Sequence, residues 1–192
     1  MAVSPLNGGT LIQNYRKTNL FVDDLTWASA GDGFKTFDLT FPKRNNISVR
    51  CMQAVCADID PHNPKNETQV CELGEFAQRN QVELIFFSTT WVFENDYVFK
   101  NETQATKDTL DYWTSRLSPL VQQKQIEDGF DHQITQNKVC YLLAADNVGV
   151  EKGIDKAGSS CVIQFDRTSG TTQVLSHLNM RENNILRQVI QL

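Results

Sequence analysis

The sequence predicts a mainly β protein, an antiparallel sandwich or barrel with one helical insertion at about residues 103–128 packed against it. In most apolar stretches, apolar and polar residues alternate as in half-buried strands, and only one long stretch has apolar residues at spacings of three and four. The chain has 192 residues, which suits one hydrophobic core. We therefore expect an N-terminal arm, residues 1–16, and a single β-rich domain, residues 17–192.

The first part of the chain predicts strands separated by turns. Short apolar strand pieces between residues 20 and 27 precede a glycine-containing turn at residues 31–33. Residues 37–41 then alternate as a half-buried strand. A longer strand follows at residues 47–59, where only Gln53 interrupts the row of apolar side chains on one face, so we expect a β-bulge there.

The middle of the chain contains the strongest single strand and the clearest helix. Residues 67–80 can hold one or two helical turns, and residues 82–93 are apolar on both faces at their start, as in a central strand. Apolar residues then recur at helical spacing. They are Leu110, Trp113, Leu117, Leu120 and Val121. Pro119 interrupts this pattern, so we expect a kink or a second helix that ends near Gly129.

The last third of the chain predicts four more strands. They lie at residues 138–144, 160–166, 172–178 and 185–192. Glycine-containing turns separate the first three, which favours an antiparallel meander.

Composition and charge exclude several classes of partner. Lys and Arg number 18 against 23 Asp and Glu, a formal net charge of −5, which disfavours binding to nucleic acid or to an anionic membrane surface. The longest unbroken apolar run, residues 139–145, is too short to span a bilayer, and residues 1–9 do not resemble a signal peptide. Five cysteines are an odd number for a disulfide framework. We therefore expect reduced thiols and synthesis in the cytoplasm.

Four side chains in one region could in principle bind zinc. They are Cys51, Cys56, His62 and Cys71. A structural zinc site usually has two cysteines two to four residues apart on a tight turn, whereas Cys51 and Cys56 are five apart on a predicted strand. The spacing disfavours zinc, and ordinary thiols are the preferred interpretation.

A loop rich in oxygen ligands follows the long strand. Asp58, Asp60, His62 and Asn63 lie together there, but the loop lacks the glycine and the bidentate acid that a helix-loop-helix calcium site needs. We interpret it as a proline-bracketed turn whose Asp and Asn side chains bond the backbone. No metal site and no cofactor is predicted.

The catalytic signals are weak. The sequence lacks the motifs of serine hydrolases, zinc peptidases, phosphate-binding loops and dinucleotide-binding folds. A thiol–imidazole pair of Cys140 or Cys161 with His177 stays open, because such partners meet in space. No catalytic residue is assigned, and a thiol-dependent enzyme is the third hypothesis.

The aromatic residues support a second hypothesis. A barrel interior could enclose a hydrophobic or planar small molecule. The residues proposed to line it are Trp27, Phe37, Phe87, Trp91 and Phe93. Burial in a filled core explains the same pattern.

The preferred hypothesis is a non-enzymatic structural subunit of a homo-oligomeric assembly. An amide-rich, weakly charged sheet protein with a terminal arm suits a virus or phage particle, as a tail-tube, neck or capsid-associated component incorporated into the virion. The sequence has 15 Asn, 15 Gln and 16 Thr. The arm and the terminal strand at residues 185–192 would bind neighbouring copies and assembly proteins.

Overall fold

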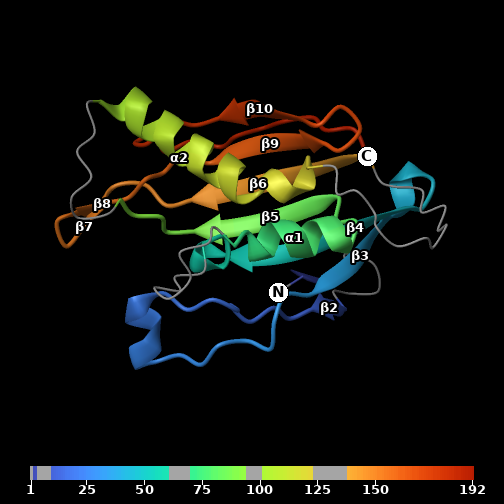
Figure 1. Ribbon diagram of the computed structural model, residues 1–192, viewed down its shortest axis with the longest axis horizontal. Helices are drawn as coiled ribbons and strands as arrows, with labels where there is room; N and C mark the ends of the chain where they lie inside the picture. The colour runs from blue at the N-terminus through green and yellow to red at the C-terminus, as the bar shows by residue number, and fades with distance from the viewer. Residues whose placement is uncertain (1, 4–9, 61–69, 94–100, 123–137) are drawn as a thin grey trace.

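A six-stranded mixed sheet forms the centre of the protein. The structure, a computed structural model, describes residues 2–3, 10–60, 70–93, 101–122 and 138–192. The strands follow the order β10-β9-β6-β5-β4-β3, with β4, β5 and β6 parallel and the other neighbours antiparallel (Figure 1). Their bounds are β3 Thr36–Phe41, β4 Ile47–Val55, β5 Leu84–Thr89, β6 Val139–Asp146, β9 Cys161–Asp166 and β10 Thr171–His177.

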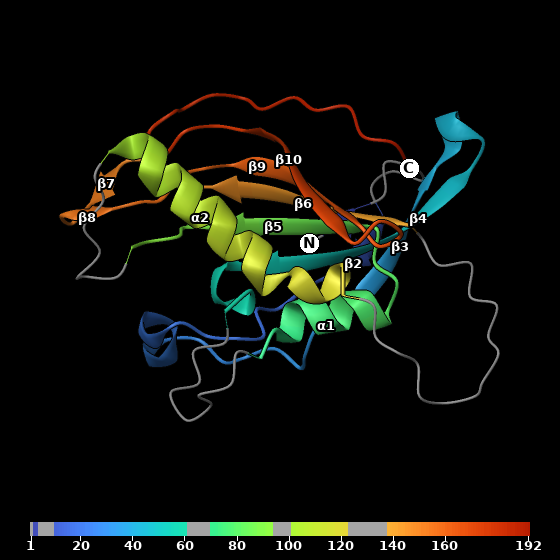
Figure 2. The same ribbon diagram turned by 45° about the horizontal axis from the view of Figure 1, so that its top comes forward.

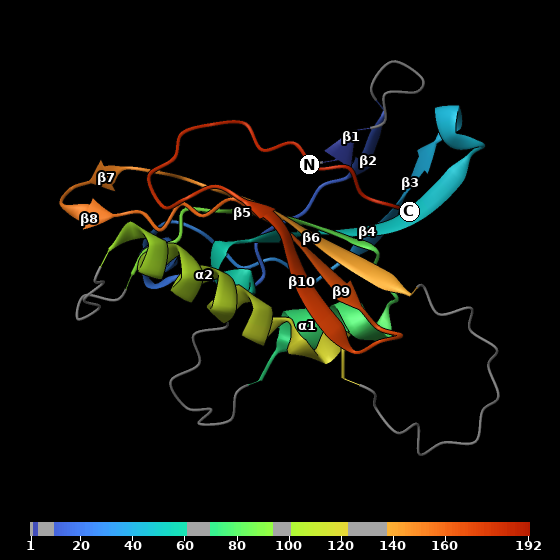
Figure 3. The same ribbon diagram turned by 90° about the horizontal axis from the view of Figure 1, so that it is seen from above.

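Two helices lie between the parallel strands in the chain and cover the same face of the sheet. Helix α1 (Glu72–Arg79) comes between β4 and β5, and helix α2 (Glu102–Arg116) comes between β5 and β6. Figures 2 and 3 show both helices on one side of the sheet. Consecutive parallel strands need such crossovers, whereas antiparallel strands do not. The predicted antiparallel sandwich or barrel is therefore wrong, and the fold is α/β.

Smaller elements surround this sheet. Two short antiparallel pairs join β1 to β2 and β7 to β8. Their bounds are β1 Ala2–Val3, β2 Leu11–Gln13, β7 Val150–Glu151 and β8 Ile154–Asp155. Among the described residues, four segments are 3-10 helices: η2 Val22–Thr26, η3 Pro42–Arg44, η4 Cys56–Asp58 and η5 Ser118–Leu120.

The two faces of the sheet carry separate apolar clusters. On the helix side, Ile85 and Phe87 of β5 pack with Leu73 of α1 and Trp113 of α2. On the opposite side, the buried cluster includes Phe37, Val49, Cys51, Leu84, Tyr141 and Val162. Leu186 and Ile190 of the C-terminal segment pack on that second side, where Figure 3 shows this segment crossing the sheet away from the helices.

Several local predictions are confirmed. The strand predicted at residues 82–93 lies between β4 and β6, in the middle of the sheet. The helical turns predicted within 67–80 form α1. The predicted insertion at 103–128 forms α2 and η5 as far as the structure describes it. The two are divided at Leu117, and Pro119 lies in the first turn of the second, as expected; residues 123–128 lie outside the described ranges.

Other local predictions are wrong. The apolar pieces between residues 20 and 27 form η2, because Asp24 accepts a hydrogen bond from Phe21 N (3.0 Å) and closes the turn. No bulge occurs at Gln53, since β4 keeps regular register with both of its neighbours. Residues 185–192 form no strand; Leu186 and Ile190 pack on the sheet without joining a ladder.

Candidate active site

Cys56 lies at the point where a central parallel strand ends. It is the first residue after β4 and the first of η4, and its φ is 49°, in the left-handed region that non-glycine residues avoid. Ligands of open α/β sheets bind beyond the carboxyl ends of the parallel strands. A strained residue at a sharp strand-to-helix turn is also how α/β-hydrolases expose a nucleophile. Cys56 is half-buried, so part of the residue is exposed at this end of the sheet.

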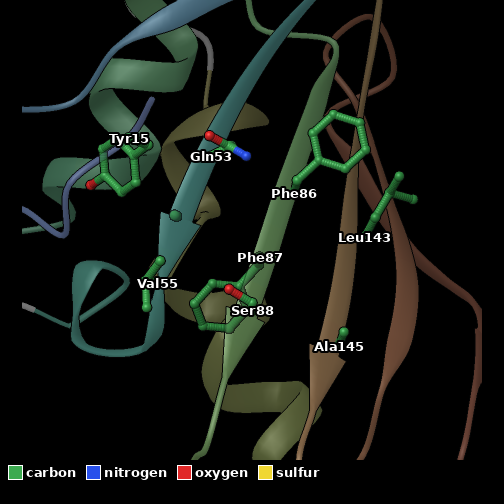
Figure 4. A pocket seen from close by; sticks show the side chains of 9 residues that line it. Tyr15, Gln53, Val55, Phe86, Phe87, Ser88, Leu143 and Ala145 are labelled. Atoms are coloured by element: carbon green, nitrogen blue, oxygen red, sulfur yellow. The ribbon is translucent and has the colours of Figure 1, made fainter. Parts of the chain in front are cut away.

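The register places two polar residues, Thr89 and Asp146, at the same end of the sheet as Cys56. Val55, Ser88 and Ala145 are aligned across β4, β5 and β6, and Figure 4 shows them in one row. The next residue on β5 is Thr89, which pairs with Asp146 of β6. Neighbouring strands are about 4.8 Å apart, and β5 lies between β4 and β6, so two strand spacings of about 10 Å separate the end of β4 from Asp146.

Lys17 brings a cation to this end of the sheet. Its Nζ lies 2.5 Å from Asp24 Oδ2, and both side chains are only 18% exposed. The hydrogen bond from Lys17 holds the pKa of Asp24 below its usual value. The Lys17 carbonyl accepts a hydrogen bond from Gly31 N at 2.8 Å. A side chain at Gly31 would collide with the Arg16 carbonyl (2.4 Å from a Cβ), so glycine permits this close approach.

A buried carboxylate joins the lysine segment to the cysteine turn. Asp58 lies two residues after Cys56 and is fully buried. It accepts hydrogen bonds from Thr18 N, Asn19 N and Tyr15 OH, which lie 39 to 43 residues earlier in the chain, and from Val55 N. Burial raises its pKa, while these four donors act in the opposite direction. The Lys17 segment and the Cys56 turn are thus in contact through one side chain.

Asp146 is the second buried carboxylate at this end. Its Oδ1 accepts hydrogen bonds from Trp91 N (2.9 Å) and Asn147 N (2.7 Å), whereas the buried Oδ2 has no partner among the described residues. Burial raises its pKa to about 7, although the two amides and the nearby Lys156 favour the charged form. Lys156 itself is paired with Glu151 at 3.2 Å.

This pKa predicts a pH-dependent stability that Asp146→Asn removes. Because the folded protein holds a proton on Asp146 that the unfolded chain releases, the free energy of unfolding falls as the pH rises from about 4 to 7. An amide keeps the two Oδ1 hydrogen bonds without the charge. Urea unfolding should show wild type losing about 1–3 kcal/mol relative to Asp146→Asn between pH 5 and pH 8. A constant difference across that range would contradict the assignment.

A shallow groove opens on the sheet face opposite the helices. It has a volume of about 290 Å³, and Figure 4 shows the side chains that line it. Its lining is largely apolar and includes Tyr15, Gln53, Phe86 and Leu143. The buried Oε1 of Gln53 has no hydrogen-bond partner in the described part of the chain. The polar residue that interrupts the β4 pattern therefore faces this groove and needs no bulge.

The predicted barrel interior does not exist. The sheet is open, since β3 and β10 are its two edges. Phe37 and Phe87 lie on opposite faces, and Trp27 is 77% exposed. The hypothesis of a β-barrel that encloses a small molecule is therefore wrong.

The candidate metal ligands are dispersed. Cys51 is buried in the apolar cluster on the face opposite the helices, and Cys71 precedes α1. Asp58 is saturated with hydrogen bonds, and Asp60 pairs with Arg116 at 3.6 Å. His62 and Asn63 lie outside the described residues. Within the described ranges, no three His, Cys, Asp or Glu side chains form a group that could hold a metal ion.

The structure makes His177 the register partner of Cys161 across β10 and β9, but the thiol of Cys161 is buried and not available for a thiol–imidazole site. Cys140 and Cys161 are buried in the cluster under the helices, where burial raises the pKa of each thiol to about 12. His177 lies at the end of β10 with its Nδ1 3.3 Å from the Leu178 carbonyl. Such thiols are chemically inert. Sequence reasoning missed Cys56, and its position where a long apolar strand meets an Asp- and Pro-containing loop was the available signal.

Comparison with known proteins identifies similar amidases. The chain is 28% identical over 187 residues to a protein N-terminal amidase of Schizosaccharomyces pombe, covering 92% of the chain and 58% of that protein. It is 27% identical over 169 residues to a protein N-terminal amidase of Saccharomyces cerevisiae, covering 82% of the chain and 31% of that protein. The chain thus spans less than two thirds of either relative. No protein-family profile matches it.

Solved structures show the same fold. A crystal structure of an N-terminal amidase superposes with a TM-score of 0.70 at 17% identity, covering 93% of this chain and 71% of that one. Related crystal structures contain Asn-Glu and Gln-Val peptides. An amidase of the nitrilase superfamily from Nesterenkonia superposes with a TM-score of 0.50 at 16% identity, covering 87% of this chain and 46% of that one.

These likenesses correct the functional predictions. The proteins similar to this chain are amidases, so the expectation of a non-enzymatic virion component, assembled through an arm and a terminal strand, is wrong. The third hypothesis, a thiol-dependent enzyme, agrees with them, although it rested on the wrong cysteines. Among the described residues, no helix combines the length and the apolar character needed to cross a membrane.

Proposed function

We propose that this chain carries the thiol centre of an amidase that converts N-terminal Asn or Gln of a peptide to Asp or Glu, with release of ammonia. The observation that carries the proposal is Cys56, held at φ 49° at the carboxyl end of β4 and beside the Lys17 segment. The names of the similar proteins and the Asn- and Gln-initiated peptides in related crystals support the substrate class.

The chemistry assigns Cys56 as the nucleophile. Its sulfur forms a bond to the side-chain amide carbon, the carbon–nitrogen bond breaks, and the thiol proton leaves with the nitrogen as ammonia. The resulting thioester is then hydrolysed by water, which returns the thiol and gives a carboxylic acid. Both steps place negative charge on the former amide oxygen.

Lys17 is the group best suited to balance that charge. Its ammonium is largely shielded from water, where a positive charge acts more strongly on a developing oxyanion or thiolate than in solvent. Asp24 fixes the ammonium at 2.5 Å and is in turn held by the Phe21 amide. We assign Lys17 as an electrostatic catalyst and Asp24 as the residue that orients it.

Hydrolysis of short peptides tests the proposal directly. The protein is incubated with peptides that begin with Asn or Gln, and the ammonia and the peptide mass are measured. We expect one ammonia per peptide and replacement of the side-chain NH2 by OH, with the peptide bonds intact. Peptides that begin with Asp or Glu are the matched negative controls.

The result that would contradict the proposal is equally specific. A folded protein that binds neither peptide and whose Cys56 reacts with iodoacetamide no faster than free cysteine at the same pH has no thiol centre. Release of ammonia that is equally fast from internal Asn would instead indicate an amidase without preference for the chain terminus.

A further inference from the structure

One buried side chain connects the two segments that carry the proposed chemistry. Residues 15–19 run on the outside of the sheet next to the end of β4, and Cys56 is in the turn that follows that strand. Asp58 lies between them with no exposed surface. Three separate donors of the 15–19 segment bond to its carboxylate and attach the segment to this turn.

The four hydrogen bonds are divided between the two segments. Oδ1 accepts from the backbone amides of Thr18 (2.9 Å) and Asn19 (2.8 Å), which directly follow Lys17. Oδ2 accepts from Tyr15 OH and from Val55 N, both at 2.8 Å, and Val55 directly precedes Cys56. Each oxygen of a carboxylate has two lone-pair sites, so the donors match its capacity.

We infer that Asp58 is a positioning residue that fixes the Lys17 segment against the Cys56 turn and thereby sets the distance between the ammonium and the thiol. The inference rests on the proposed roles of Lys17 and Cys56. It assigns Asp58 no contact with substrate, because all four of its acceptor sites are already occupied.

The turn itself has a second support that does not involve Asp58. Arg116 of α2 donates from Nε to the Ile59 carbonyl (3.1 Å) and from Nη2 to the Val70 carbonyl (2.5 Å), and it is only 9% exposed. Loss of the Asp58 carboxylate therefore leaves the turn attached to the helix layer. The main effect should fall on residues 15–19, so the lysine should become mobile while the cysteine stays in place.

Asp58→Asn is the variant that tests this inference. The side chain keeps its shape, but its NH2 group cannot accept the hydrogen bonds that one carboxylate oxygen accepts. Asp38→Asn is the matched control, because Asp38 is an exposed strand residue paired with Arg50 at 3.2 Å. It removes the same charge far from the site.

The first readout is the acylation rate of Lys17, measured by peptide mass spectrometry with an amine-reactive ester. In wild type, Lys17 is 18% exposed and should react slowly, while Lys107, at 65%, should react fast. In Asp58→Asn, we expect the Lys17 rate to rise about tenfold, the factor that corresponds to one lost charge-assisted hydrogen bond, with Lys107 unchanged. Asp38→Asn should leave both rates at their wild-type values.

The second readout is the division between kcat and KM. A displaced cation should lower kcat about tenfold and leave KM nearly unchanged. Because a smaller folded fraction also lowers the apparent kcat at constant KM, kcat is divided by the folded fraction measured by circular dichroism. Tyr15→Phe removes one of the four donors and should give a smaller change of both readouts. It provides the test if Asp58→Asn does not fold.

The outcomes separate the two proposals. Unchanged Lys17 acylation in folded Asp58→Asn overturns the positioning role, whatever the activity. Faster acylation in a protein that has no amidase activity at all would confirm the positioning contact and contradict the proposed function. Equal loss of kcat in Asp58→Asn and Asp38→Asn would show that charge, and not position, is the cause, and would also overturn the inference.

Discussion

Replacement of Cys56 by alanine is expected to abolish amide hydrolysis, with a loss in kcat/KM of about 10³-fold or more. The variant cannot form the thioester, and no other thiol of the chain has a comparable position. Cys56 is half-buried and lies outside both apolar clusters, so the free energy of unfolding should change by less than about 1 kcal/mol. Ammonia release and urea unfolding of the same preparation measure the two quantities.

Glycine at the same position separates function from stability. A left-handed backbone costs a non-glycine residue about 1–2 kcal/mol, and glycine avoids this cost. Part of the resulting stabilisation is lost, because glycine also gives the unfolded chain more conformational freedom. Cys56→Gly should therefore be inactive and about 0.5–1 kcal/mol more stable than Cys56→Ala. Equal stability of the two variants would mean that the φ of 49° is not strained in this turn.

The other four cysteines supply the controls. Cys51, Cys140 and Cys161 are buried, and burial raises the pKa of each thiol to about 12, so iodoacetamide should not modify them in the folded protein. Cys71 is half-buried like Cys56, but it precedes α1 and lies 3.9 Å from the Ser115 carbonyl. Cys71→Ala should keep full activity. An active Cys56→Ala together with an inactive Cys71→Ala would place the thiol centre elsewhere.

The elements of the fold were largely predictable from periodicity. Alternation located β3, β4, β6, β9 and β10, and apolar residues on both faces marked β5 as central. Helical spacing located α2. These patterns depend only on which side chains face the core, and that information is local in the sequence.

The direction of the strands was not predictable in the same way. An apolar, alternating strand has the same pattern in a parallel and in an antiparallel ladder. The two crossover segments were the available signal, since residues 67–80 and 103–128 each had helical character between two strong strands. Treating the second as an insertion, and the strands as a meander, led to the sandwich prediction, whereas two helices between three strands form consecutive crossovers.

The candidate site was not predictable because its residues differ from their neighbours only in three dimensions. Cys56 and Cys140 each lie at or within an apolar strand, yet one is at a left-handed turn and the other is sealed beneath the helices. Asp58 was interpreted as bonding the local backbone, which is correct for Val55, but its partners at residues 15–19 are about 40 positions away. Cys56 is recognised as a site residue by its position at the carboxyl end of a parallel strand. The alternation of apolar residues does not reveal strand direction, so it could not reveal that position.

Trp113 gives the largest expected effect on stability. It is fully buried on α2, with its ring edge-to-face against Phe87 of β5 at a centroid distance of 5.4 Å and against Trp91 at 6.3 Å. Trp113→Ala removes the side chain that joins the long helix to the central strand. We expect the free energy of unfolding to fall by about 3–5 kcal/mol, measured by far-ultraviolet circular dichroism in urea so that lost tryptophan fluorescence does not interfere.

Trp113→Phe tests whether packing alone explains this loss. The indole Nε1 is buried without a hydrogen-bond partner among the described residues, which costs about 1–3 kcal/mol in the native protein. Phenylalanine keeps one aromatic ring and removes this cost, so its effect should be at most about 1.5 kcal/mol. A Trp113→Phe variant as unstable as Trp113→Ala would contradict the account.

The same packing reaches the candidate site. Trp91 packs against Trp113, and its backbone amide donates a hydrogen bond to Asp146. A loss of kcat in folded Trp113→Phe would therefore show that this core packing affects the chemistry.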